Sequence, residues 1–148
     1  MQSATGATVI HLSCHGSFDS EDPLSSGLLL ADGVLSAREI MELSLHADLV
    51  TVSACESGFS TTSKGEELAG ISRALLYAGS SSSLLALWQV DAATTLEWMI
   101  DFYRRTRDSI GNKIMDDATA FREATLALKA RHPNPVFWAP FVLIGDWH

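Results

Sequence analysis

Short runs of apolar residues, separated by polar segments, predict five β-strands. Residues 48–53 and 83–88 are almost continuously apolar, which is typical of strands covered by helices on both faces of a parallel sheet. After the apolar run of residues 27–31, Asp32-Gly33 interrupts the pattern and predicts a small hairpin with residues 34–35. The predicted strands cover residues 7–13, 27–31, 48–53, 83–88 and 141–144.

Helical patterns lie between these strands. Ser36 and Glu39 have the spacing of a capping box, and the apolar stripe of residues 66–78 stops at Gly79, a typical C-terminal cap. A 3.6-residue period also begins at Thr95, and a further helix opens at residue 116 or 117 and stops before Pro133. The alternation of strands and helices predicts an α/β fold with a mostly parallel sheet.

Length and composition place limits on the class of protein. The 148 residues suit one domain, and no repeat of 20–50 residues is present. The chain is 47% hydrophobic with a net charge of −8, which disfavours disorder and nucleic-acid or anionic-membrane partners. Two cysteines cannot form a disulfide scaffold, and neither a signal peptide nor a membrane-spanning stretch is evident. We therefore expect a globular, cytoplasmic protein.

Two candidate catalytic residues follow the first and third predicted strands. His15 and Cys55 would lie just past the ends of parallel strands, at the edge of the sheet where ligands of α/β folds gather. A thiol nucleophile and an imidazole acting as general acid and base suit this arrangement. The N–H groups of Gly16 and Cys55 are candidate donors to an oxyanion. A lone cysteine or histidine there is usually structural, so the pairing carries the hypothesis.

Other chemistries fit less well. Strand alternation separates Cys14 from His11 and His15, which predicts a buried, inert Cys14 and a hydrogen-bonded His11, and disfavours a zinc site. No Gly-x-Ser-x-Gly motif supports a serine hydrolase, and no phosphate-binding loop is present.

The motifs in their order resemble the CHAT domain, a caspase-like (clan CD) cysteine peptidase family related to separase. The resemblance covers nearly the whole chain. It rests on residues 11–16 (HLSCHG), 26–33 (SGLLLADG), 48–58 (DLVTVSACESG), 65–70 (GEELAG), 78–79 (AG), 87–91 (LWQVD), 102–103 (FY) and 137–146 (FWAPFVLIGD).

This resemblance implies a three-layer αβα caspase-like fold and a Cys55/His15 dyad. Cys55 would be the nucleophile, His15 the general acid and base, and Gly16 and Cys55 the oxyanion-hole donors. The reaction would be hydrolysis of peptide bonds in a protein or peptide substrate through an acyl-enzyme, without metal or cofactor. Because CHAT domains often accompany tetratricopeptide repeats in bacteria, we expect residues 1–148 to be the C-terminal part of a larger, regulated protein.

Two departures from the family pattern matter. Separase-like relatives can carry an acid after a Trp-x-Val segment that selects a basic substrate side chain, and Ala92 occupies that position here. Either Asp91 substitutes for that acid or the basic preference is lost, and Asp91 is equally well explained as a helix cap. Trp88, at a strand end, is a candidate wall of the substrate pocket.

The second departure is at the N-terminus: caspase-like cores carry two strands before the histidine strand, whereas this sequence starts directly on that strand. Val9 and Ile10 are then expected on an open sheet edge. We expect an upstream segment to supply the two strands, and the alternative is that another protein completes the domain. The alternative to an endopeptidase is a non-catalytic module that keeps the fold for protein interaction.

Overall fold

The computed structural model describes residues 6–17, 19, 21–56, 64–88, 90–108 and 110–146, with the backbone alone at 54–56 and 64–69. Its six strands are β1 (Val9–Ser17), β2 (Gly27–Leu30), β3 (Gly33–Ser36), β4 (Leu49–Glu56), β5 (Ser82–Ala86) and β6 (Phe141–Gly145). The helices of the described residues are α1 (Ala37–Met41), α2 (Lys64–Tyr77), α3 (Ala92–Thr106), α4 (Asp117–Arg131) and α5 (Pro135–Trp138).

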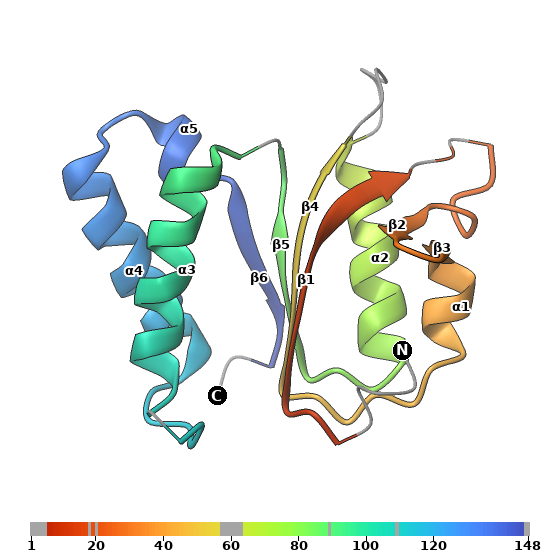
Figure 1. Ribbon diagram of the computed structural model, residues 1–148, viewed down its shortest axis with the longest axis horizontal. Coiled ribbons are helices and arrows are strands. Elements are labelled where there is room, and N and C mark those ends of the chain that lie inside the picture. Colours follow the sequence, from red (N-terminus) through yellow and green to blue (C-terminus); the bar gives the residue numbers. More distant parts are fainter. Residues whose placement is uncertain are drawn as a thin grey trace.

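The strands form one sheet in the order β3-β2-β1-β4-β5-β6. β1, β4 and β5 are parallel, whereas the β2–β3 hairpin and β6 run antiparallel to their neighbours. The helices α1 and α2 lie on one side of the sheet, and α3 and α4 lie on the other (Figure 1). The predicted three-layer α/β fold is therefore confirmed, with its parallel strands at the centre.

Each side of the sheet has its own hydrophobic core. The first core joins α1 and α2 to β1, β2, β4 and β5 through residues such as Ile10, Leu28 and Ile71. The second core joins α3 and α4 to β4, β5 and β6 around Trp98, whose ring stacks between Phe102 and Phe141. No described residue of β1, β2 or β3 belongs to the second core. The two faces of the sheet are therefore covered to different extents.

Local signals in the sequence fix several boundaries as expected. The Ser36 hydroxyl accepts a hydrogen bond from the Glu39 N–H at 3.2 Å, and the Ser36 N–H donates to the Glu39 carboxylate at 2.8 Å, which completes the capping box of α1. Gly79 ends α2 with φ +101°, and the N–H of Ser80 donates to the carbonyl of Leu75. This is a Schellman motif, which requires the left-handed backbone that glycine adopts readily.

Several boundaries differ from the sequence prediction, among them the end of β4 at Glu56 and the end of β5 at Ala86. β1 continues to Ser17 because its last three residues pair with β2, and residues 15 and 16 also pair with β4, a long-range pairing that no local pattern reveals. α3 begins at Ala92 rather than Thr95, since Asp91 caps it. The short helix α5 was not predicted, because four residues cannot display a 3.6-residue period.

The expected open edge of β1 is present. β2 pairs only with residues 15–17, so on that side no strand of the described chain pairs with residues 9–14. None of the described helices is long and apolar enough to cross a membrane.

Candidate active site

The parallel pairing of β1 with β4 brings the two predicted catalytic positions together. His15 pairs with Cys55, and Gly16 pairs with Glu56, in register along the two strands. Neighbouring strands lie about 4.7–4.9 Å apart, so these two backbones are adjacent. The sequence predicted that both positions lie just past the ends of their strands. They lie instead within the last residues of the strands, because the pairing of β1 with β4 continues to residues 16 and 56. The side chain of Cys55 lies outside the described residues.

A cleft of about 400 Å³ runs between this end of the sheet and the beginning of α3. Its floor is polar, because alternation along β1 turns His11, Ser13 and His15 toward α3, and Ser53 of β4 joins them. Its wall is largely apolar and is formed by Val90, Ala92, Thr95, Leu96 and Met99. The cleft therefore combines a polar strip with an apolar wall, as ligand-binding clefts commonly do.

A half-buried tyrosine of α3 contacts the floor of the cleft. The Tyr103 hydroxyl lies 2.7 Å from Thr51 Oγ1 on β4 and 3.0 Å from His11 Nδ1 on β1. Burial raises the pKa of the Tyr103 phenol and lowers the pKa of His11. The hydrogen bond predicted for His11 is confirmed, but its partner Tyr103 was not predicted. Tyr103 belongs to the apolar stripe of α3, which indicates packing and not polar contact, and to the motif at residues 102–103, which names no partner.

Comparison with protein families identifies the chain. The family model of the CHAT domain matches residues 1–146. The chain belongs to the CHAT domain family. This family is caspase-like and related to peptidases, in agreement with the fold and with the histidine and cysteine positions paired above. A comparison with curated proteins found no match.

In this CHAT domain, Cys14 lies on the other face of β1 from His15. It borders the cleft, but its side chain packs against the first core. Burial raises the pKa of the Cys14 thiol, so the reactive thiolate is disfavoured. Cys14 is only half-buried, although it packs against the core as predicted, and its inertness stays a prediction. The described part of the chain also holds no group of three histidine, cysteine, aspartate or glutamate side chains that could bind a metal ion.

Gly16 is buried and pairs on both sides, with Leu28 of β2 and Glu56 of β4. An oxyanion donor must direct its N–H toward the substrate. The predicted role of Gly16 therefore requires that its N–H be free of the ladder at the end of β1.

The other predicted substrate-binding residues are not in the lining of the cleft. The Asp91 carboxylate accepts hydrogen bonds from the Thr94 N–H and hydroxyl, at 2.9 and 3.0 Å, and the N–H bond lowers its pKa. Trp88 donates its indole N–H to the Val136 carbonyl at 3.3 Å. Asp91 is thus the cap of α3, as one of the two sequence interpretations proposed, while Ala92 does line the cleft. A substrate contact by Trp88 or Asp91 stays a prediction.

Proposed function

We propose that this CHAT domain is a cysteine endopeptidase in which Cys55 is the nucleophile and His15 the general acid and base. The observation that carries the proposal is the register of β1 and β4, which pairs these two positions on adjacent parallel strands. Residues alternate between the two faces of a strand, so position 55 lies on the same face of β4 as positions 51 and 53.

 Positions 51, 53 and 55 of β4 therefore share one face of the sheet with His11, Ser13 and His15 of β1, and this is the face toward α3.

The reaction follows from ordinary thiol chemistry. The Cys55 sulfur, as a thiolate, attacks the carbonyl carbon of the peptide bond, and the N–H groups of Gly16 and Cys55 donate to the oxygen on which negative charge develops. Each such donor is worth about 2.7–4 kcal/mol in known hydrolases. His15 gives its proton to the leaving amine, which departs and leaves a thioester. A water molecule, deprotonated by His15, then hydrolyses the thioester and restores the thiol.

The surroundings of His15 support this chemistry. Its side chain is exposed at the floor of the cleft, where a substrate can reach it. The competing thiol, Cys14, belongs to the opposite face and has a raised pKa. A proton transfer at this site therefore involves His15 and Cys55 in preference to Cys14.

The test compares the two cysteines. Hydrolysis of denatured casein by the full chain is measured for the wild type and for Cys55→Ala, Cys14→Ala and His15→Gln. We expect Cys55→Ala and His15→Gln to lower the rate by at least about 10³-fold, as loss of a nucleophile or base does in known peptidases. Cys14→Ala is the matched control and should keep the wild-type rate. Equal loss from both cysteine variants would contradict the proposal.

A second measurement separates the peptidase from a non-catalytic module. Iodoacetamide labelling, read by mass spectrometry, should modify Cys55 faster than Cys14, and His15→Gln should slow that labelling. A Cys55 that reacts like an ordinary thiol, in a chain without hydrolytic activity, would favour the interaction module.

A further inference from the structure

A row of paired positions crosses four strands of the sheet at the level of His15. Cys55 of β4 pairs with His15 of β1, His15 pairs with Leu29 of β2, and Leu29 pairs with Val34 of β3. Directly paired positions in a sheet lie on the same face. The row of paired positions therefore continues from the proposed dyad onto the β2–β3 hairpin, in the direction away from α3.

The hairpin end of this row is apolar and uncovered. Leu29 is 37% exposed and Val34 is 43% exposed, whereas Leu28, next to Leu29, is fully buried in the first core. A hairpin with one face on a core normally presents polar side chains on its other face. Two large apolar side chains at a directly paired position on that face form a small surface, which we call the Leu29/Val34 surface. Within the described chain, the second core does not extend over it.

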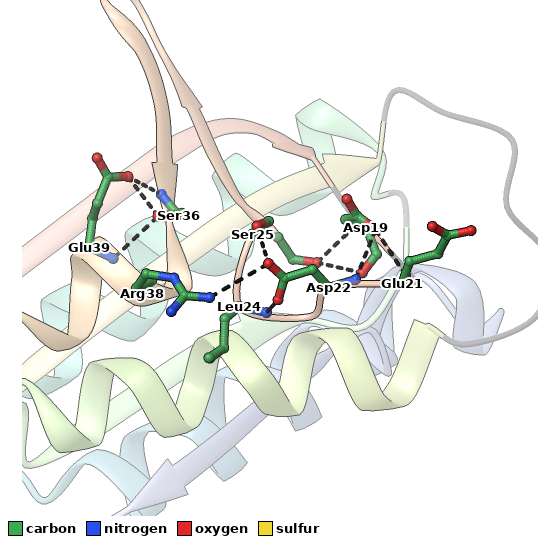
Figure 2. Close-up of polar contacts among 9 residues, drawn as sticks. Asp19, Glu21, Asp22, Leu24, Ser25, Ser36, Arg38 and Glu39 are labelled. Carbon is green, nitrogen blue, oxygen red and sulfur yellow. Dashed lines mark hydrogen bonds and ion pairs between the residues drawn. The ribbon is translucent and has the colours of Figure 1, made fainter.

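Hydrogen bonds link the described residues between β1 and β2. The Asp19 carboxylate accepts from the N–H groups of Glu21 and Asp22, and the Asp22 carboxylate accepts from the Leu24 N–H and the Ser25 hydroxyl (Figure 2). Arg38 lies 3.6 Å from Asp22 and ties the connection to α1. The pairing of β2 with β1 places Leu29, and with it the Leu29/Val34 surface, beside His15.

We propose that the Leu29/Val34 surface is a substrate subsite that binds an apolar side chain close to the scissile bond. This inference rests on the proposed peptidase function. At about 4.8 Å between strands, Val34 lies roughly 10 Å from His15, which an extended peptide spans in about three residues. A substrate that crosses the row places its scissile bond at His15 and a side chain two or three residues away on this surface.

Continuity with the proposed dyad favours a substrate as the occupant. The Leu29/Val34 surface begins at Leu29, the residue paired with His15. A peptide that is bound at the dyad and leaves the cleft on the side opposite α3 therefore meets this surface. An apolar side chain there would bury apolar area of both partners, whereas a charged side chain would lose hydration without a partner.

The experiment profiles cleavage sites in a mixed-sequence peptide library with the wild type, Leu29→Lys, Val34→Lys and a control, Leu24→Lys. Leu24 is 41% exposed, a fraction similar to the 43% of Val34, but it lies outside the row of paired positions. We expect the wild type to favour apolar residues at one position within three residues of the cut. Leu29→Lys and Val34→Lys should lower that preference about tenfold and raise cleavage with Asp or Glu at the same position. Leu24→Lys should leave the profile unchanged.

Iodoacetamide labelling of Cys55 and size-exclusion chromatography accompany every profile. Normal labelling with a profile that the lysines do not alter would overturn the subsite and leave the peptidase standing. Normal labelling without any cleavage of the library would also overturn the subsite. A change of oligomeric state in Leu29→Lys or Val34→Lys, with an unaltered profile, would assign the surface to a second copy and overturn the proposal. An unreactive Cys55 with no hydrolysis would overturn the peptidase and the subsite together.

Discussion

The two faces of the sheet differ in how far their helices cover them. On the side of α1 and α2, apolar residues of β1, β2, β4 and β5 pack into one core, and Leu28 is completely buried there. On the side of α3 and α4, the core covers β4, β5 and β6, while the same face of β1 carries exposed histidines and a serine. The first face stabilises the fold, and the second leaves a polar area beside a cleft. The proposed chemistry lies where the helical layer stops.

Adjacent residues of β2 offer the strongest way to break this comparison. Leu28→Ala should cost about 2–5 kcal/mol of unfolding free energy, because it leaves a cavity in a packed core. Leu29→Ala, one residue along and 37% exposed, should change that free energy by less than about 0.5 kcal/mol. Urea denaturation followed by tryptophan fluorescence measures both variants. Similar losses in the two variants would mean that the Leu29 face is also a structural core.

This contrast between neighbours shows what the sequence can predict. Alternating and continuous apolar runs located all the strands, and the capping box at Ser36 and the glycine at position 79 fixed two helix ends, because these are local signals. The apolar run of residues 28–30 did not reveal that Leu28 and Leu29 face different surroundings. That difference depends on which helices cover each face, and it is set by contacts between segments distant in the chain.

The candidate site divides in the same way. The family motifs and the expectation of parallel strands sufficed to place His15 beside Cys55, and alternation placed Cys14 on the other face. The role of Asp91 remained open between a pocket acid and a cap, because one residue type serves both. Tyr103 was missed, since its partners Thr51 and His11 lie 52 and 92 residues away.

The polar contact beneath the cleft sharpens the comparison on a smaller scale. Thr51 is fully buried, so Tyr103→Phe leaves its hydroxyl without this partner and should cost about 1–2 kcal/mol of unfolding free energy. In Tyr103→Phe/Thr51→Val both hydroxyls are gone, and the loss should be smaller than the sum of the single losses by about 1 kcal/mol. Tyr77→Phe is the control, because Tyr77 is 74% exposed. Additive losses would show that the two hydroxyls do not stabilise one another.

The smallest expected effect is a pH dependence from His11. Partial burial against α3 lowers the pKa of His11 below the model-peptide value of 6.5, so the folded protein takes up this proton at a lower pH than the unfolded chain. As the pH falls through 6.5, the unfolded state binds more protons and the free energy of unfolding decreases. His11→Gln removes this contribution, so its stability should fall less than that of the wild type between pH 7.5 and 5.5. An NMR titration of the His11 ring should give a midpoint below 6.5. A midpoint at or above 6.5 would mean that water reaches the imidazole fully and that the open part of this face extends beneath Tyr103.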